Sequence, residues 1–295
     1  MINQKKLLMM SRENVMSKEI PIKNPFHETY LAVQAALEAG KTVMNVYNQE
    51  FSSTLKSNNE PLTEADIKSN NTIQKIISDS GYSILSEESE DNKKRLGSKK
   101  IWIVDPLDGT SDFIKKTGEF TIMISLVEDH VPILGVIYWP TKSTLYLAQK
   151  DQGAFKSENS SWSKLSVSNI SELKNCRAVG SRFHITEIEQ NLIKRLNISQ
   201  FTPKGSSLKV ADVSSGNAEL YFTTTNKIKQ WDTCASYCLV TEAGGKMTDM
   251  FGNDLEYNTE KLNHENGLLV SNGLIHNQII NIYRETMEKY EQKKS

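Results

Sequence analysis

The spacing of apolar side chains predicts two helices in the first part of the chain. Between residues 26 and 50, apolar positions recur at close to helical intervals with polar residues between them, which is typical of an amphipathic helix. A second helix is predicted to begin near Thr63, because Thr63 and Asp66 have the spacing of a capping box, and to end at Gly81. We expect these helices to flank a sheet.

Short runs of β-branched and aromatic residues, bounded by Asp, Gly or Pro, predict the strands. Three of them follow one another as KIWIVDPL, EFTIMISLVED and VPILGVIYWP. After Gly153 the chain becomes rich in Ser and Asn, and beyond this change CRAVGSR and AELYFTTT are predicted strands while ITEIEQNLIKRL is a predicted helix. We therefore expect an extension over residues 1–25, an α/β half over 26–160 and a second α/β half over 161–295.

The composition is that of an ordinary folded protein. Of the 295 residues, 38% are apolar and 24% are charged, which is enough for one large domain or two packed ones. Lys and Arg number 35 against 36 Asp and Glu, so the net charge is −1 and no global field attracts a polyanion such as nucleic acid. Any phosphate site must therefore be local.

The N-terminal stretch does not have the pattern of a signal peptide. Lys5 and Lys6 precede a short apolar run, but Arg12 and Glu13 interrupt it too soon. No window approaches the roughly 18 uncharged apolar residues of a transmembrane helix. We expect a cytoplasmic protein, monomeric or homodimeric, and leave open whether its N-terminus touches the cytoplasmic face of the inner membrane.

The cysteines and most histidines are expected to be structural. The three cysteines do not form the pattern of a disulfide framework, and Cys234 and Cys238 lie four residues apart on one side of a predicted helix, as buried packing thiols do. The five histidines lack the spacing of metal ligands. We therefore expect His130, His264 and His276 at the surface.

The string IWIVDPLDGTSDF carries the most informative polar residues. An apolar strand runs into Asp105, a proline fixes the turn, and Asp108 follows, so two carboxylates point into a loop. They repel each other unless a cation lies between them, and Mg²⁺ accepts such oxygen ligands, including the carbonyl of Leu107. Gly109 allows close backbone approach, and the N–H groups of residues 109–111 form an anion-binding end. This pattern is typical of metal-assisted phosphoester hydrolysis.

Each acidic segment also has an ordinary structural explanation when it is taken alone. DPLDG is then a strand-end turn, Glu87 and Glu88 of LSEES form a solvated acidic turn, and Asp232 of WDTCASYC caps a helix. If the strand before LSEES continued, the two glutamates would point to opposite sides and only one could reach a metal. The occurrence of all these segments in one chain favours the metal site.

The order of four strings resembles the inositol monophosphatase superfamily of lithium-sensitive, magnesium-dependent phosphatases. These strings are PLTEAD, LSEES, WIVDPLDGT and WDTCASYCLVTEAGG, and the resemblance covers nearly the whole chain after residue 25. It implies an α/β layered αβαβα sandwich of the inositol monophosphatase and fructose bisphosphatase type. It also places a metal site between the two halves.

The resemblance implies two Mg²⁺ ions, or three if one more is held through water. Glu87, Asp105 and the Leu107 carbonyl would bind one ion, while Asp105, Asp108 and Asp232 would bind a second. Glu87 would also hold the third ion through water. These ligands are expected to face the phosphate of the substrate as well.

The resemblance also implies which residues act on the attacking water. Thr110 would orient this water with the assistance of Asp66, and Glu87 would share in catalysis through the metal. Gly109 and Thr110 would donate backbone hydrogen bonds to the phosphate. The chemistry expected is in-line attack of a metal-activated water on phosphorus.

Further strings resemble the bisphosphate nucleotidase branch of the superfamily. They are DPLDGTSDFIKKTGEFTIMISL, PILGVIYWP, SRFH, GSSLK and AELYF, and they imply hydrolysis of adenosine 3′,5′-bisphosphate to AMP and phosphate. Ser206, Ser207 and Lys209 resemble the segment that holds the second phosphate, although the same turn alone is typical of a helix N-terminus with an exposed lysine. His184 resembles a nearby contact.

One departure from this branch concerns the segment before Trp231. Close relatives carry an arginine there, whereas this chain reads FTTTNKIKQ, so Lys227 or Lys229 is the expected, imperfect replacement. Inositol monophosphatase or fructose-1,6-bisphosphatase activity is the enzymatic alternative. A catalytically silent nucleotide-binding regulator is the other, but such proteins usually lose a metal ligand, and this chain keeps the set.

Overall fold

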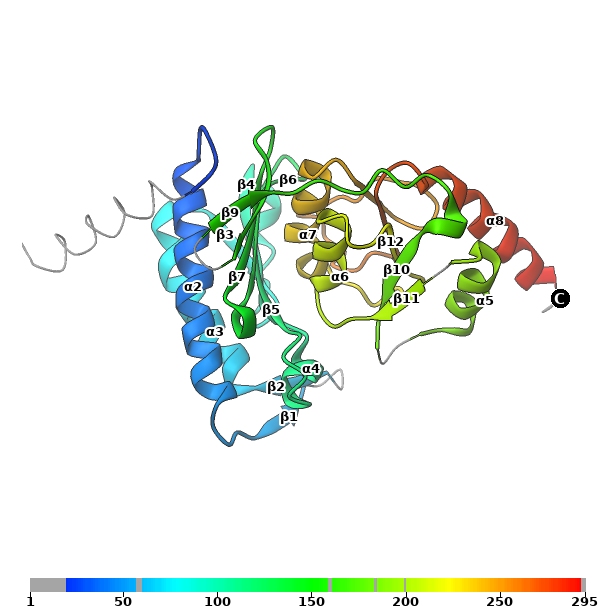
Figure 1. Ribbon diagram of the computed structural model, residues 1–295. Helices are drawn as coiled ribbons and strands as arrows, with labels where there is room; N and C mark the ends of the chain where they lie inside the picture. Colours follow the sequence, from blue (N-terminus) through cyan, green and yellow to red (C-terminus); the bar gives the residue numbers. More distant parts are fainter. Residues whose placement is uncertain (1–19, 57–59, 159–160, 183–184, 199, 293–295) are drawn as a thin grey trace, which may run out of the picture.

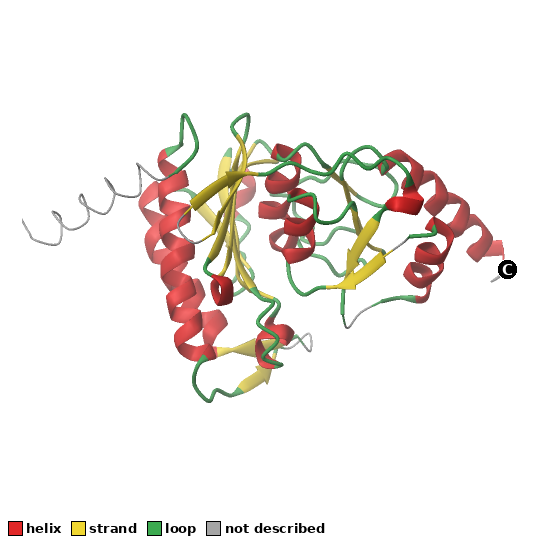
Figure 2. Ribbon diagram, in the orientation of Figure 1, coloured by secondary structure: helices red, strands yellow, loops and turns green. Residues whose placement is uncertain are grey.

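Helices and sheets alternate in layers across the molecule (Figures 1 and 2). The computed structural model describes residues 20–56, 60–158, 161–182, 185–198 and 200–292. The layers are α2 with α3, a large sheet, α6 with α7, a smaller sheet, and α5 with α8. The predicted αβαβα sandwich is confirmed.

The helices that the sequence predicts are present, and the structure adds the C-terminal helix α8, which the sequence analysis did not predict. The first two begin and end within a few residues of the predicted limits, and Thr63 and Asp66 do form a capping box. None of the helices in the described part of the chain is long and apolar enough to cross a membrane. The bounds are α2 (His27–Tyr47), α3 (Glu64–Ile77), α4 (Thr110–Ile114), α5 (Glu187–Leu196), α6 (Leu208–Ser214), α7 (Gln230–Glu242) and α8 (His276–Gln292).

The large sheet has its strands in the order β3-β4-β5-β6-β7-β8-β9. The first pair is parallel and the others are antiparallel. Beside it lies a short antiparallel hairpin of β1 (Ser53–Leu55) and β2 (Pro61–Thr63). The bounds are β3 (Ser83–Ser86), β4 (Lys100–Asp108), β5 (Thr121–Glu128), β6 (Val131–Trp139), β7 (Thr144–Gln149), β8 (Gly153–Glu158) and β9 (Ser161–Lys164).

The smaller sheet has its strands in the order β11-β10-β12-β14-β13. β10 pairs in parallel with both β11 and β12, and β14 pairs antiparallel with β12 and β13. The bounds are β10 (Arg177–Gly180), β11 (Gln200–Pro203), β12 (Leu220–Thr223), β13 (Lys246–Thr248) and β14 (Leu268–Ser271).

The large sheet extends past the predicted division between the halves. β8 and β9 form an antiparallel hairpin in which Glu158 lies opposite Ser161. A cut between residues 160 and 161 would therefore fall inside this hairpin. In the structure the first sheet continues to Lys164 before the chain crosses to the second half.

Apolar cores fill the spaces between the layers. Ile73 and Trp102 belong to the core between the large sheet and the helices α2 and α3. Leu220 and Ile279 belong to the core between the smaller sheet and its outer helices. Helix α7 packs in the middle layer, and its Cys234 and Cys238 are buried free thiols, as predicted.

Two histidines are buried, and the prediction that they lie at the surface was wrong. The ring of His276 is held between the hydroxyl groups of Thr248, at 2.9 Å, and Ser271, at 2.8 Å. Burial lowers the pKa of both His264 and His276 to about 4. His130 is exposed, as expected. The local sequence around the two histidines does not indicate which hydroxyl groups form hydrogen bonds with their buried rings.

Candidate active site

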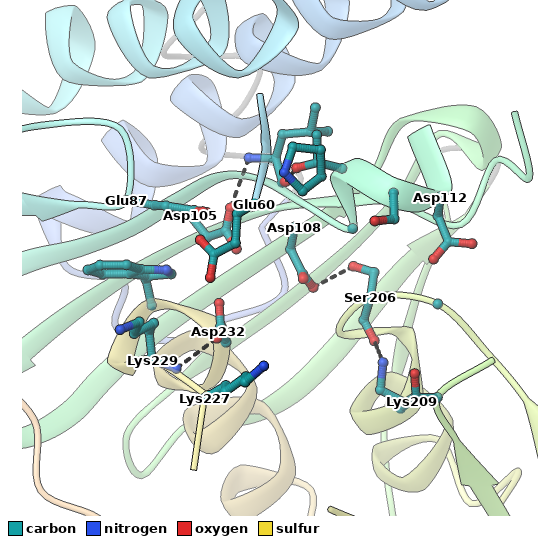
Figure 3. Close-up of a pocket in the computed structure, with 18 of the residues that line it drawn as sticks. Glu60, Glu87, Asp105, Asp108, Asp112, Ser206, Lys209, Lys227, Lys229 and Asp232 are labelled. Atoms are coloured by element: carbon teal, nitrogen blue, oxygen red, sulfur yellow. Dashed lines mark hydrogen bonds between the residues drawn. The ribbon is translucent and has the colours of Figure 1, made fainter. Parts of the chain in front are cut away.

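The four predicted metal-binding carboxylates, but not Asp66, line one pocket between the two halves of the molecule (Figure 3). Its volume is about 250 Å³, close to the lower end of the roughly 300–1,000 Å³ typical of small-molecule sites. Six carboxylates line it, namely Glu60, Glu87, Asp105, Asp108, Asp112 and Asp232. Five cationic side chains also line it, namely Arg182, Lys204, Lys209, Lys227 and Lys229.

Asp105 and Asp108 reach the same pocket because β4 is irregular between them. In a regular strand, residues three apart point to opposite faces of the sheet. Here Asp105 lies opposite Met123 of β5 and Asp108 lies opposite Thr121, so two residues of β4 face one residue of β5. The extra residue reverses the alternation, and both carboxylates line the pocket.

Asp105 is the most enclosed of these carboxylates. Its side chain is 1% exposed, and its Oδ1 atom accepts a hydrogen bond of 3.0 Å from the N–H of Leu107. Burial raises the pKa of Asp105 well above its ordinary value, and the neighbouring carboxylates of Glu87, Asp108 and Asp232 raise it further. Without an added cation, the charged form of Asp105 is therefore disfavoured.

Glu87 follows directly after β3, which ends at Ser86. Because the strand does not continue, Glu87 and Glu88 are not forced to opposite sides, and both contact the ammonium group of Lys56, at 2.8 and 2.5 Å. Glu87 lines the pocket and Glu88 does not. Of the two predicted candidates, only Glu87 is placed to reach the pocket acids.

Burial and the charge of the partner shift the pKa values of Glu87 and Lys56 in opposite directions. Burial raises the pKa of Glu87 to about 7, against the lowering effect of the Lys56 ammonium. Burial alone would lower the pKa of Lys56, but Glu87 and Glu88 raise it above its ordinary value. Lys56 therefore stays protonated and supplies a positive charge beside the acidic cluster.

Asp232 comes from the first turn of α7. Its Oδ2 atom accepts a hydrogen bond of 2.8 Å from the N–H of Lys229, the residue before the helix, so it caps α7 as well as lining the pocket. Burial raises its pKa well above the ordinary value, with Glu87 and Asp108 adding to the effect. The Asp232 side chain thus both caps α7 and lines the pocket.

A turn from the second half of the chain holds Asp108. The Oδ2 atom of Asp108 accepts a hydrogen bond of 2.5 Å from the Ser206 hydroxyl group (Figure 3). It also accepts one of 2.6 Å from the N–H of Ser207. Both serine hydroxyl groups lie 2.7 Å from the hydroxyl group of Thr121 on β5. The serines predicted as substrate contacts are therefore engaged with a pocket acid.

Thr110 and Asp66 meet although they lie far apart in the sequence. The Thr110 hydroxyl group donates to Asp66 Oδ1 at 3.1 Å and lies 3.2 Å from the Leu107 carbonyl oxygen. Thr63 donates to the other Asp66 oxygen through its N–H, at 2.7 Å, and its hydroxyl, at 2.6 Å. Burial raises the pKa of Asp66, and the hydrogen bonds from Thr63 and Thr110 limit the rise.

The remaining predicted residues lie at the other wall of the pocket or outside the described chain. Gly109 has φ = 90° and precedes α4, so the turn uses the left-handed region that favours glycine. Lys209 lines the pocket, and its ammonium group donates to the Ser206 carbonyl oxygen at 2.6 Å. His184 lies outside the residues that the structure describes.

Comparison with known proteins agrees with this arrangement. A profile described as the inositol monophosphatase family matches residues 27–288.

The chain belongs to the inositol monophosphatase family.

Among its relatives in the family are proteins named 3′(2′),5′-bisphosphate nucleotidase CysQ. The one from Buchnera aphidicola is 38% identical over 231 residues, which span 76% of this chain and 85% of that protein. The one from Escherichia coli K12 is 35% identical, spanning 76% of this chain and 91% of that protein. The crystal structure of CysQ from Bacteroides thetaiotaomicron has a TM-score of 0.73 and 32% identity, covering 83% of this chain and 96% of that one.

The donor set of this inositol monophosphatase family member fits a hard divalent cation. Glu87, Asp105, Asp108 and Asp232 each have one oxygen engaged in a hydrogen bond or ion pair. Within the described part of the chain, the second oxygen of each has no hydrogen-bond partner, and these are the oxygen ligands that Mg²⁺ prefers. As the side chains stand, no three acidic, histidine or cysteine groups among the described residues are close enough to hold a metal ion.

Sequence reasoning missed three residues that shape the site. Lys56 lies in a segment with no chemical motif, and Thr121 lies within the long string that begins at Asp105 but was not singled out there; only the fold brings them to Glu87 and to the Ser206 turn. Arg182 lies inside the SRFH string, which was a usable signal. Its guanidinium group contacts Asp112 at 3.1 Å and Glu119 at 2.7 Å.

Proposed function

We propose that this member of the inositol monophosphatase family is a Mg²⁺-dependent phosphatase that hydrolyses the 3′-phosphate of adenosine 3′,5′-bisphosphate, giving AMP and phosphate. The observation that carries the proposal is the gathering of Glu87, Asp105, Asp108 and Asp232 around one pocket. The choice of substrate is supported by the relatives named CysQ, which are 31–38% identical to this chain.

The proposed metal ligands are those that the family resemblance implies, and their position in the lining of one pocket supports them. Glu87, Asp105 and the Leu107 carbonyl oxygen would hold one Mg²⁺, and Asp105, Asp108 and Asp232 a second, with Glu87 available to a third through water. Bound there, the ions supply the positive charge that activates the attacking water and stabilises the charge on the phosphate oxygens. The raised pKa values of Asp105 and Asp232 support this assignment, because among the described residues neither carboxylate forms an ion pair with a positive side chain.

Thr110 and Asp66 are proposed to orient the water and receive its proton. Since Thr110 donates its hydroxyl proton to Asp66, its lone pairs remain to accept a hydrogen bond from the water. Burial makes Asp66 a better proton acceptor than a surface carboxylate. Attack forms a bond from the water oxygen to phosphorus, breaks the bond to the 3′ oxygen, and moves a proton overall from water to that leaving oxygen.

The turn after β4 and the wall opposite it are proposed to hold the rest of the substrate. A Cβ atom on Gly109 would lie 3.2 Å from both the Glu119 carbonyl oxygen and Ser206 Cβ, so a side chain at this position would crowd the turn. The N–H groups of Gly109 and Thr110 are proposed donors to the phosphate. Ser206, Ser207 and Lys209, with His184, form the proposed wall beside the nucleotide.

A phosphate-release panel tests the proposal. Purified protein is assayed with adenosine 3′,5′-bisphosphate, inositol 1-phosphate and fructose 1,6-bisphosphate, with Mg²⁺ and with excess EDTA. We expect the highest kcat/KM for the nucleotide and loss of turnover with EDTA. Phosphate release from inositol phosphate but not from the nucleotide would show that the proposed substrate is wrong while the proposed mechanism still holds. Nucleotide binding without any turnover would indicate a catalytically silent regulator.

A further inference from the structure

The cationic side chains of the pocket are not equally available to a ligand. The floor of the pocket is acidic, so an anionic group there requires added cations. A second anionic group on the same small molecule would be repelled by that floor and needs a positive side chain of the protein at the rim. Five cationic residues line the pocket, and their existing contacts decide which of them can serve.

Four of the five are already engaged. Arg182 lies between Asp112 and Glu119, and Lys204 forms an ion pair with Asp212. The Lys209 ammonium donates to the Ser206 carbonyl oxygen at 2.6 Å, and the Lys229 ammonium donates to Asn263 Oδ1 at 2.6 Å. Moving any of these groups toward a ligand would leave a protein carboxylate, carbonyl or amide without its partner.

Lys227 differs from the other four. It is exposed, it lines the pocket, and within the described part of the chain its ammonium group has no hydrogen bond or ion pair. Figure 3 shows its side chain extending into the pocket from the loop before α7, near Asp232. Its charge is therefore available to a ligand without breaking an existing contact.

We propose that Lys227 recognises the second phosphate group of the substrate and so sets the preference for a bisphosphate over a monophosphate. This inference rests on the proposed phosphatase function. It also separates two lysines that the sequence could not distinguish, because Lys229 is held by Asn263 while Lys227 is not. A lysine ammonium suits this task as a mobile point charge for a phosphate.

The test compares two substrates that differ only in the second phosphate, adenosine 3′,5′-bisphosphate and adenosine 3′-monophosphate. For Lys227→Met we expect kcat/KM on the bisphosphate to fall about tenfold, through KM, because one partly solvated charge contact is lost. On the monophosphate the change should stay within about twofold, and Lys227→Arg should keep most of the preference. The matched control is Lys229→Met, which should leave the ratio between the two substrates unchanged.

The outcomes separate this inference from the proposed function. If Lys227→Met lowers kcat/KM equally for both substrates, or for neither, Lys227 does not recognise the second phosphate. The same conclusion follows if Lys229→Met removes the preference for the bisphosphate. If the wild-type protein instead hydrolyses inositol or sugar phosphates, the nucleotide function fails. In that case the role of Lys227 is tested by the ratio of kcat/KM for a bisphosphate to kcat/KM for a monophosphate among the inositol or sugar phosphates that the protein hydrolyses.

Discussion

Individual carboxylates in the pocket are held in an unfavourable state. Asp105 is buried beside three other acids, and burial together with their charge raises its pKa. Lys56 neutralises part of this charge but contacts Glu87 and Glu88, not Asp105. At the scale of single residues, we therefore expect added cations to relieve this repulsion, and the protein to be less stable without them.

Replacing Asp105 by Asn tests this arrangement. Asn keeps an oxygen that can accept the Leu107 N–H but removes the charge. We expect Asp105→Asn to raise the thermal midpoint in EDTA, to remove the stabilisation of the wild type by Mg²⁺, and to lower phosphate release by at least about a hundredfold. The exposed Asp79→Asn variant serves as control and should behave as wild type in all three measurements. Undiminished turnover in Asp105→Asn would rule out the shared-ligand proposal.

Helix α7 connects the pocket to the packing of the middle layer. It begins next to Asp232, and it lies close against β6 at Gly135. A Cβ atom on Gly135 would lie 2.5 Å from the Ala235 carbonyl oxygen and 3.0 Å from Cys238 Cβ. The absence of a side chain at this one position therefore sets the distance between the helix and the sheet.

Gly135→Ala is expected to push α7 away from the sheet. Because the nearest atom belongs to the helix backbone and cannot rotate aside, we expect a loss of about 1–3 kcal/mol in the free energy of unfolding, measured with urea. Gly97→Ala is the matched control, since a Cβ atom there meets nothing within 4 Å and the change should stay within about 0.5 kcal/mol. Equal effects of the two substitutions would contradict the close packing of α7.

Local sequence was enough to predict several central elements but not their assembly. The capping box of Thr63 and Asp66 depends on residues three apart, so it could be predicted and is present. The assignment of β9 to the first sheet depends on a hairpin within a Ser- and Asn-rich stretch whose composition resembled a linker. The bulge that turns Asp105 and Asp108 to one side depends on the partner strand, which the local pattern does not contain.

At the scale of the whole molecule, buried histidines link stability to acid pH. His264 and His276 have their pKa values lowered to about 4 by burial, with Asp249 opposing the shift for His264 and Lys246 adding to it for His276. Between about pH 6.5 and pH 4 the unfolded chain binds protons on both rings and the folded chain does not. Folded-state stability should therefore fall as the pH falls through this range, by about 1.4 kcal/mol per pH unit for each ring.

His276→Gln isolates this contribution. Gln can still form hydrogen bonds with Thr248 and Ser271 but does not titrate, so the loss of stability between pH 6.5 and pH 4 should be smaller than in the wild type. The pocket carboxylates, whose pKa values are raised, stabilise the fold as pH falls, so the informative quantity is the difference between variant and wild type. His27→Gln, at an exposed position, should leave the slope as it is. An unchanged slope in His276→Gln would show that this ring does not carry the effect.

The sequence by itself predicted four of the helices and several central strands from short-range periodicity, and the acidic residues from motifs of a few residues, while the layered fold was implied by the family resemblance. Only the tertiary structure decided which groups meet across long sequence separations. It placed Lys56 on Glu87, the Ser206 turn on Asp108, and two histidines in the interior. It also separated Lys227 from Lys229, because hydrogen bonds between distant segments form only once the layers have packed.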